Sequence, residues 1–193
     1  MALPIMIVVV MGPDIHSWLD SAWKKGQKTK YVKGSDDNKQ AIADAVMYLS
    51  SRKIGALITI EKHKLLDQYA EKAIVMNAEI SKELLINIFS PLTPLHDGAV
   101  IIKGNKIRCA GAYYVLSTRE TLDKTVGSRH RAALGISETT DALTIVVSEE
   151  TGTVSFAIRG ELIPVKMNEF KAMLLKEIDE YINPEKTGGG KHE

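Results

Sequence analysis

The chain has 193 residues, of which 45% are hydrophobic and 25% are charged, and its formal net charge is +1. This length and composition predict one globular domain with a core of its own. The near-zero charge excludes a general electrostatic attraction to nucleic acid or to an anionic lipid surface. The one cysteine, Cys109, excludes an internal disulfide and fits a reducing compartment. Its strand-like surroundings favour a buried structural thiol over a reactive one.

The N-terminal region combines an apolar run with a helical pattern. Ala2–Met11 is too short to span a bilayer, which takes about 20 apolar residues, and its Ile and Val content predicts a buried strand over Leu3–Met11. Gly12-Pro13-Asp14 then begins a helix on which Trp18 and Trp23 share one face. Packing in a core or an interface explains that spacing better than a platform for stacking bases.

Helix and strand patterns alternate through the rest of the first half. The expected elements are a helix over about Asp36–Arg52, a strand over Ile54–Ile60, a short helix over about His63–Tyr69, a small strand at Ile74–Met76 and a helix after Ser81. Ser81 suits the N-cap of that last helix, and Pro91 and Pro94 end it in a rigid loop.

The second half is richer in strands. The expected elements are strands over Ala99–Lys103 and Lys106–Leu116, a polar loop over Ser117–Gly127, a helix near Arg129–Ser137, strands over Leu143–Ser148, Thr153–Ile158 and Leu162–Val165, and a helix over about Asn168–Ile182. Gly104-Asn105 is a two-residue hairpin signal. These patterns predict one α/β domain around a mixed sheet, residues 1–182, followed by a disordered tail at 183–193.

The chain lacks several common motifs of nucleotide and catalytic sites: GxxxxGK[ST], GxGxxG after a strand, HExxH and GxSxG. Polar residues gather instead in three short segments. In the first, Leu95-His96-Asp97-Gly98-Ala99, Asp97 lies at a strand end, where a carboxylate can bind a metal ion or activate a hydroxyl. Gly98 permits a ligand to approach the backbone closely. Taken alone, this segment is more typical of an Asp-Gly turn before a strand, in which His96 is a hydrogen-bonded loop histidine.

The second segment is Gly127-Ser128-Arg129-His130-Arg131. Ser128 suits the N-cap of a helix that begins with two arginines, and cations in a first helical turn oppose the helix dipole. A bound phosphate would give the free N–H groups, the hydroxyl and the guanidinium groups a common partner. A solvated basic patch is the alternative.

The third segment, Ser148-Glu149-Glu150-Thr151-Gly152, ends a strand at a turn. With His96, its two carboxylates would provide mixed imidazole and carboxylate ligands for a divalent ion, which suit Mn²⁺ better than Mg²⁺. Alone, the pair is also typical of a polar hairpin tip. The strand that leads toward the basic segment carries Tyr113, Tyr114 and Leu116. These side chains would flank a purine ring, although packing in the sheet explains them almost as well.

Together these segments resemble the diadenylate cyclase (DAC) domain. The two hallmarks of that family, Asp-Gly-Ala and Arg-His-Arg, stand here as Asp97-Gly98-Ala99 and Arg129-His130-Arg131. The resemblance covers about residues 4–165, is nearest to the membrane-anchored bacterial branch, and implies a mixed, mostly antiparallel sheet flanked by helices. It extends through Pro94–Ile102, Gly127–Glu138 and Val147–Gly152.

The resemblance implies a role for each segment. Asp97, Arg129, His130 and Arg131 would be catalytic, with Asp97 helping to activate a ribose 3′-hydroxyl. The residues implied to bind nucleotide are Asp97, Gly98, Ala99, Tyr113, Tyr114, Leu116, Gly127, Ser128, Arg129, His130, Ser148 and Glu149. The implied metal ligands are His96, Asp97 and Glu150, and the imidazole favours Mn²⁺ or Co²⁺ over Mg²⁺. Tyr114-Val115 departs from the family, which commonly has Leu-Pro there, and Ser128 replaces a usual Thr.

The implied activity is the condensation of two ATP molecules into 3′,5′-linked cyclic di-AMP, with release of two pyrophosphates. Each subunit of a face-to-face homodimer would bind one ATP, and each 3′-hydroxyl would attack the α-phosphate of the other ATP with the help of a divalent metal. The implied partners are ATP and a second copy, not nucleic acid. Two forms fit the resemblance. Either an anchor upstream of Ala2 holds the protein at the cytoplasmic face of the membrane, or the chain is a soluble member of the family. The alternative function is a catalytically silent module that binds ATP or cyclic di-AMP.

Overall fold

The structure is a computed structural model that describes residues 36–119 and 127–180, all of which fall within one compact unit. The strand expected over Leu3–Met11, the helix after Gly12 and the tail at 183–193 lie outside the described residues, as do both ends of the expected domain. None of the described helices has the length and apolar composition that crossing a bilayer requires.

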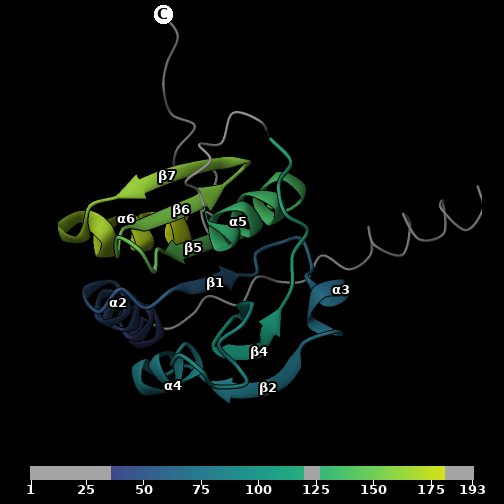
Figure 1. The fold of residues 1–193 in the computed structure, drawn as a ribbon, viewed down its shortest axis with the longest axis horizontal. Helices are drawn as coiled ribbons and strands as arrows, with labels where there is room; N and C mark the ends of the chain where they lie inside the picture. The colour runs from purple at the N-terminus through teal and green to yellow at the C-terminus, as the bar shows by residue number, and fades with distance from the viewer. Residues whose placement is uncertain (1–35, 120–126, 181–193) are drawn as a thin grey trace, which may run out of the picture. The chain divides into compact units, whose positions relative to one another are not determined.

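A mixed sheet forms the centre of the described unit (Figure 1). Its strand order is β2-β4-β3-β1-β5-β6-β7, and among these described strands only β1 and β3 pair in parallel. This confirms the predicted α/β class with a mostly antiparallel sheet. The strands are β1 (Ala56–Ile60), β2 (Ile74–Glu79), β3 (Ala99–Lys103), β4 (Lys106–Ala112), β5 (Leu143–Val147), β6 (Val154–Ile158) and β7 (Glu161–Val165).

Helices cover both faces of the sheet. One core joins the sheet to α2 (Asp36–Ser51), α4 (Lys82–Ile88) and α6 (Met167–Glu180). The other core joins it to α3 (Asp67–Ala70) and α5 (Ser128–Thr139). Along β3, for example, Val100 and Ile102 belong to the first core and Ala99 and Ile101 to the second, because neighbouring side chains of a strand point to opposite faces.

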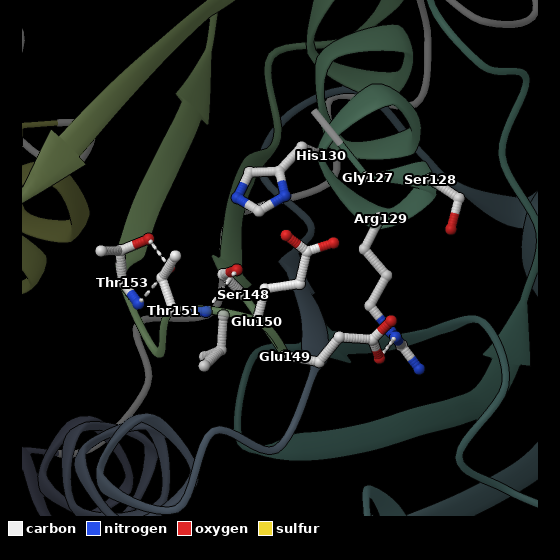
Figure 2. Close-up of a pocket in the computed structure, with 10 residues that line it drawn as sticks. Gly127, Ser128, Arg129, His130, Ser148, Glu149, Glu150, Thr151 and Thr153 are labelled. Atoms are coloured by element: carbon white, nitrogen blue, oxygen red, sulfur yellow. Dashed lines mark hydrogen bonds and ion pairs between the residues drawn. The ribbon is translucent and has the colours of Figure 1, made fainter. Parts of the chain in front are cut away.

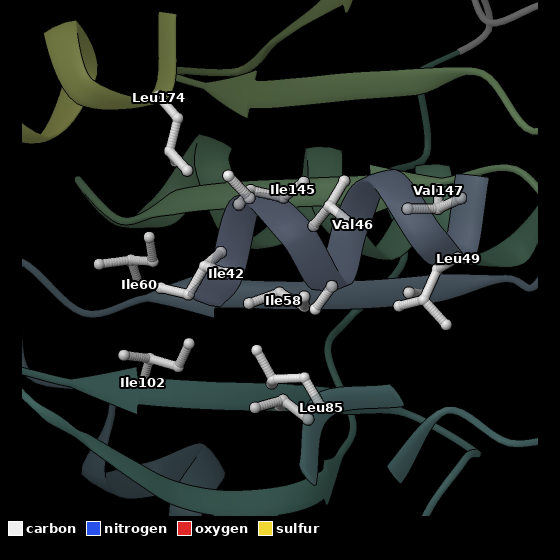
Figure 3. Close-up of a cluster of buried hydrophobic side chains, with 14 of the residues drawn as sticks. Ile42, Val46, Leu49, Ile58, Ile60, Leu85, Ile102, Ile145, Val147 and Leu174 are labelled. Carbon is white, nitrogen blue, oxygen red and sulfur yellow. The ribbon is translucent and has the colours of Figure 1, made fainter. Parts of the chain in front are cut away.

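Helix α2 shows how the apolar spacing builds the first core. Ile42, Val46 and Leu49 recur every three or four residues and are at most 3% exposed. Figure 3 shows them packed over the sheet residues Ile58 and Ile145. The predicted inward face of this helix is therefore confirmed, and α2 ends one residue before the predicted boundary.

The second core contains Cys109, which is fully buried and forms no disulfide. Burial raises the pKa of its thiol above the ordinary value, which disfavours the reactive thiolate. The prediction of a buried structural thiol is confirmed.

In the first half of the chain, two predicted boundaries are wrong by three or four residues because tertiary contacts override the local pattern. The short helix expected from His63 begins only at Asp67. The Asp141 carboxylate accepts hydrogen bonds from the backbone N–H groups of His63 and Lys64, at 3.2 and 2.9 Å, and holds this stretch as a turn. The small strand expected at Ile74–Met76 continues to Glu79, past an irregularity in its pairing.

The strand expected to reach Leu116 ends at Ala112. From there the chain leaves the sheet and lies along α5, where the backbone N–H of Ser117 donates to the carbonyl of Arg131 at 3.0 Å. The hairpin predicted at Gly104-Asn105, which joins β3 to β4, is confirmed.

The strand registers bring the polar segments to one end of the sheet. Ala56, at the start of β1, pairs with Val147, at the end of β5, and β3 starts alongside β1 because the two are parallel. Ala99, at the start of β3, pairs with Ala112, at the end of β4. The residues next to these strand ends therefore share one end of the sheet: Gly55, Asp97, Gly98, Tyr113 and Ser148.

Candidate functional site

An open cavity of about 250 Å³ lies between the N-terminus of α5 and the turn from β5 to β6 (Figure 2). Two of the segments singled out in the sequence, Gly127–His130 and Ser148–Glu150, meet in its walls. Three further lining residues received no role from the sequence, although they lie within or next to the third segment. They are Val147, Thr151 and Thr153.

The N-terminus of α5 supplies one wall of the cavity. The predicted N-cap, Ser128, is wrong: Gly127 occupies that position with extended backbone angles, and none of the described side chains caps the helix. The carbonyl of Gly127 accepts the N–H groups of His130 and Arg131, at 3.1 and 3.2 Å. The N–H groups of Ser128 and Arg129 are the first-turn donors that helix geometry leaves open, and the Ser128 hydroxyl is not used in capping.

Arg129 is held at the base of the cavity by an ion pair. Its Nη1 donates to Oε2 of Glu149 at 2.6 Å, which ties α5 to the β5–β6 turn. Gly55 lies against this pair, because a Cβ there would be 2.7 Å from Nη1 of Arg129 and 2.9 Å from Oε2 of Glu149. The buried Nε of Arg129 has no hydrogen-bond partner among the described residues.

His130 and Glu150 set the remaining charge of the cavity. Figure 2 shows the Glu150 carboxylate between the His130 ring and the Arg129–Glu149 pair. Burial lowers the pKa of His130 below its ordinary value, and the nearby charge of Glu150 opposes this only in part. With His130 neutral, the described lining carries two carboxylates and one guanidinium. Such a lining repels an isolated polyphosphate, whereas a divalent cation bound with the phosphates would reverse the balance.

Asp97 is exposed at the start of β3, where its Oδ2 accepts a hydrogen bond from the Tyr113 hydroxyl at 2.9 Å. This bond raises the pKa of Tyr113 above its ordinary value. The next residue, Gly98, has φ +101°, and a Cβ there would be 2.8 Å from the carbonyl oxygen of Ala112. Glycine is therefore required here by the backbone angle and by the approach of β4.

His96 is oriented by its own loop. Its Nδ1 lies 2.5 Å from the carbonyl oxygen of Thr93, so Nδ1 carries the proton and Nε2 keeps a lone pair suited to a metal ion. Among the described residues, however, no three His, Cys, Asp or Glu side chains are grouped closely enough to hold an ion. Strand β1 separates β3, which begins two residues after Asp97, from β5, which leads to Glu150, and strands two apart are about 10 Å from each other.

The segment after β4 splits its side chains between the surface and the core. Tyr113 and Leu116 are 67% and 44% exposed, whereas Tyr114 is 8% exposed and its ring packs edge-on against Tyr69, 5.2 Å between centroids. Any contact of Tyr114 with a ligand at the surface therefore falls to its backbone. Arg131 is absent from the cavity lining, and its guanidinium donates to the carbonyl oxygen of Ser117.

Comparison with known proteins assigns this arrangement to a family. Residues 43–162 match the family model described as "DAC: DisA bacterial checkpoint controller nucleotide-binding". The chain belongs to the DAC family. The matched range contains the Asp97 segment, the N-terminus of α5 and the β5–β6 turn.

Named relatives and solved structures support the same family assignment. A diadenylate cyclase of Listeria monocytogenes (serotype 1/2a, strain 10403S) is 45% identical over 179 residues, which are 90% of this chain and 66% of that protein. The crystal structure of a double mutant of DacA from Staphylococcus aureus has a TM-score of 0.72 at 45% identity, covering 74% of this chain and 96% of that one. A hypothetical membrane spanning protein from Bacillus cereus has a TM-score of 0.66 at 38% identity, covering 82% and 79%. The chain thus spans about two thirds of the length of the Listeria protein.

Proposed function

We propose that this chain is a diadenylate cyclase, which condenses two ATP molecules into cyclic di-AMP and releases two pyrophosphates. The observation that carries the proposal is the cavity at the N-terminus of α5, which lies at the same end of the sheet as Asp97. The cavity suits a chain of phosphates, and the Asp97 carboxylate suits a hydroxyl that must lose a proton. The Listeria relative named a diadenylate cyclase supports the same assignment.

The phosphate chain of ATP would bind in the cavity. The open N–H groups of the first turn, the Ser128 hydroxyl and the Arg129 guanidinium all donate hydrogen bonds, and the helix dipole favours an anion there. Because Glu149 already pairs with Arg129 at 2.6 Å, a phosphate would have to share or replace this partner. The adenine would lie toward the exposed side chains of Tyr113 and Leu116.

Asp97 would act on the ribose. Its carboxylate would accept the proton of the 3′-hydroxyl, or orient that hydroxyl, while the oxygen forms a bond to the α-phosphorus of another ATP. The bond from that phosphorus to the bridging oxygen breaks, and pyrophosphate leaves. Tyr113 donates a hydrogen bond to Asp97 at 2.9 Å, so the hydroxyl of the substrate would have to share or replace this partner.

The reaction would require two copies of the chain. Within one copy, β1 lies between the strand that leads from Asp97 and the strand that leads to the cavity wall. A nucleotide whose phosphates fill the cavity therefore needs its attacking hydroxyl from a second nucleotide, which a facing copy would present. Two such attacks, one in each direction, close the cyclic product.

A divalent metal would assist, and the donor set fits one in its chemistry. His96 offers Nε2, and Asp97 and Glu150 offer carboxylate oxygens, a mixture that suits Mn²⁺ or Co²⁺. Because one copy does not group the three, phosphate oxygens or the facing copy would have to complete the ligand shell. Such an ion supplies positive charge that stabilises the reacting phosphate.

The direct test is to incubate the purified chain with ATP and Mn²⁺ and to separate the products by chromatography. Cyclic di-AMP should accumulate, and Asp97→Asn should lower its rate by roughly 10²- to 10⁴-fold, as for the loss of a general base. ATP binding should survive in that variant. A wild-type chain that binds ATP without making product would instead be a silent binding module, and near-normal turnover by Asp97→Asn would remove the role of that carboxylate.

We further propose that the full-length protein is held at a membrane, since the similar Bacillus cereus structure is described as a membrane spanning protein. Fractionation of cells that produce the full-length protein tests this. Recovery with the membranes is expected, and recovery in the soluble fraction would contradict it.

A further inference from the structure

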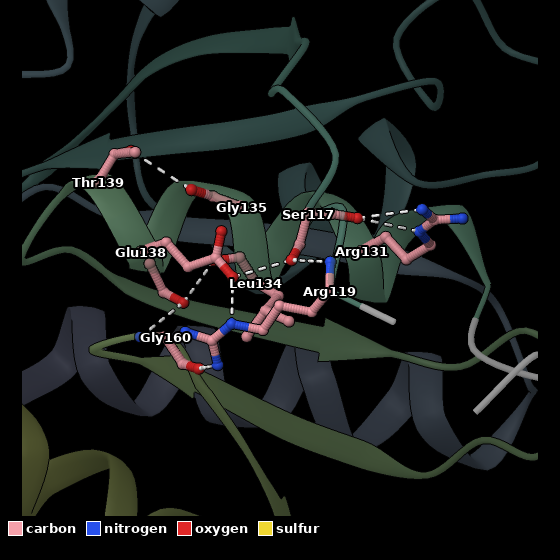
Figure 4. Close-up of polar contacts among 9 residues, drawn as sticks. Ser117, Arg119, Arg131, Leu134, Gly135, Glu138, Thr139 and Gly160 are labelled. Carbon is pink, nitrogen blue, oxygen red and sulfur yellow. Dashed lines mark hydrogen bonds and ion pairs between the residues drawn. The ribbon is translucent and has the colours of Figure 1, made fainter. Parts of the chain in front are cut away.

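Arg131 faces away from the cavity. Its Nε and Nη2 donate to the backbone carbonyl oxygen of Ser117 at 3.3 and 3.1 Å, as Figure 4 shows. Arg129, two residues earlier on the same helix, lines the cavity and Arg131 does not. The two arginines of the Arg-His-Arg motif therefore make different contacts: one lies in the phosphate cavity and the other holds the chain that follows β4.

The same stretch of chain makes three more contacts with α5. The backbone N–H of Ser117 donates to the carbonyl of Arg131 at 3.0 Å, and its hydroxyl donates to Oε1 of Glu138 at 2.8 Å. One turn along the helix, the carbonyl oxygen of Val115 occupies the space above Gly135, where a Cβ would lie only 2.0 Å from it. Each contact sets the position of this segment along the helix.

The far end of the segment is held as well. Arg119 Nη1 donates to the carbonyl oxygen of Gly160, in the β6–β7 turn, at 2.6 Å, and its Nε lies 2.9 Å from Oε1 of Glu138. The segment Tyr113–Arg119 is thus anchored along its length to α5 and to the turn beyond it. Its first residues carry the exposed side chains that would face the adenine.

We infer that Arg131 is a positioning residue, which fixes the distance between the adenine-binding part of the site, at Tyr113 and Leu116, and the phosphate cavity at the N-terminus of α5. The inference rests on the proposed function. It replaces the expected contact of Arg131 with phosphate: two of its N–H groups are already committed to Ser117. A nucleotide that spans both parts gains from their fixed separation, whereas a ligand that fills only the cavity does not.

A pair of variants on one helix separates the two roles. Arg131→Met and Arg129→Met remove the same charged group two residues apart. Affinities for ATP and for inorganic tripolyphosphate, both with Mn²⁺, are measured by calorimetry on each. Arg131→Met should weaken ATP binding about tenfold, roughly 1.4 kcal/mol, and leave tripolyphosphate binding within about twofold of wild type. Arg129→Met should weaken both ligands together.

Ser117→Ala provides a second test that keeps every arginine. It removes the hydrogen bond to Glu138 and should weaken ATP binding about threefold, roughly 0.65 kcal/mol, again without changing tripolyphosphate binding. Parallel loss of both ligands in Arg131→Met would make Arg131 a phosphate ligand and overturn the inference. Unchanged ATP affinity in both Arg131→Met and Ser117→Ala would overturn it too. A wild-type chain that binds tripolyphosphate but not ATP would contradict the proposed function itself, and the inference with it.

Discussion

Gly55 is the residue on which the geometry of the Arg129–Glu149 pair depends most directly. A Cβ at this position would lie 2.7 Å from Nη1 of Arg129, so alanine must displace the guanidinium. Because the displaced atoms are ends of flexible side chains, Gly55→Ala should change the free energy of unfolding by less than about 0.5 kcal/mol. Binding of tripolyphosphate with Mn²⁺ should weaken about fivefold, since Arg129 is no longer preorganised. Calorimetry and urea denaturation measure the two effects.

A double-mutant cycle with Glu149→Gln is the control for this prediction. Glutamine cannot form the ion pair, so in this background Arg129 is already less firmly held. The loss of tripolyphosphate affinity caused by Gly55→Ala should therefore be smaller than in the wild-type background. Equal effects of Gly55→Ala in the wild-type and Glu149→Gln backgrounds would show that it acts by some route other than the pair.

His130 should make the ligand-free protein less stable in mild acid. Burial holds its pKa in the folded chain below the value of 6.5 expected when unfolded. Between these two pKa values the unfolded chain binds more protons than the folded one, so the free energy of unfolding rises with pH there and falls as pH drops below about 6.5. Urea denaturation of the metal-free protein from pH 7.5 down to about pH 5 measures the trend.

His130→Gln is the matched control, because it keeps a polar side chain of similar size that does not titrate. Its stability should fall less steeply with acid than that of wild type over the same window. Parallel curves for the two proteins would assign the loss to other groups.

At the scale of single residues, the sequence indicated which segments line the cavity but not the contacts between their side chains and the rest of the fold. It identified Gly127–His130 and Ser148–Glu150, which do line one cavity, from residue types alone. It did not identify Gly55, since a glycine before a strand carries no signal for the side chains that approach it from elsewhere. The sequence could not predict the contact of Arg131 either, because its partner is a backbone carbonyl 14 positions away.

At the scale of elements, the local sequence patterns correctly predicted those helices and turns that local interactions determine. Helix α2 and the β3–β4 hairpin match their predictions because apolar spacing and a two-residue turn determine them. The start of α3 and the end of β4 do not match, since each depends on a distant partner. Asp141 holds the turn before α3, and α5 draws the chain away from β4 after Ala112.

A substitution at Gly135 tests how closely the segment Tyr113–Arg119 packs against α5. Alanine normally stabilises a helix interior by about 1 kcal/mol relative to glycine. Here the new Cβ would lie 2.0 Å from the carbonyl oxygen of Val115, a backbone atom that moves only with its segment. Overpacking of this kind typically costs about 1–3 kcal/mol, and so close an overlap belongs at the upper end. Gly135→Ala should therefore lower the free energy of unfolding by about 2 kcal/mol in urea denaturation.

Gly127→Ala is the comparison for stability, because none of the described atoms lies within 4 Å of a Cβ at that position. Because alanine is much less favoured than glycine at an N-cap, Gly127→Ala should lower the free energy of unfolding by about 0.5–1 kcal/mol, clearly less than Gly135→Ala. If Gly135→Ala were as stable as Gly127→Ala, the contact between the Val115 carbonyl and the helix would be looser than the structure describes.

At the scale of the whole molecule, strand order decides which polar segments meet. The sequence predicts strand ends for Asp97 and Ser148, yet it contains nothing that places β1 between β3 and β5. This insertion puts the carboxylate of Asp97 and the cavity at the N-terminus of α5 at the same end of the sheet, but next to strands that do not adjoin. It also explains why His96, Asp97 and Glu150 are not grouped as a metal site within one copy.

The separation of Asp97 from the cavity leads to a prediction about the number of chains in the active unit. If one copy holds the phosphates and another presents the hydroxyl, the rate of cyclic di-AMP formation per chain should rise with chain concentration and level off when the dimer is saturated. ATP binding per chain, measured alongside, should stay constant under the same dilution. Product chromatography over a series of dilutions makes the measurement.

A mixed dimer tests the same geometry without relying on dilution. When wild-type chains are co-purified with an excess of Asp97→Asn chains carrying a different tag, each mixed pair has one working carboxylate. Only one bond can then form quickly, so the product should be a linear dinucleotide that keeps one triphosphate. Purely cyclic product in proportion to the wild-type fraction, together with a rate per chain that does not change on dilution, would mean that a single copy completes the reaction alone. The separation of Asp97 and the cavity by β1 would then have no part in catalysis.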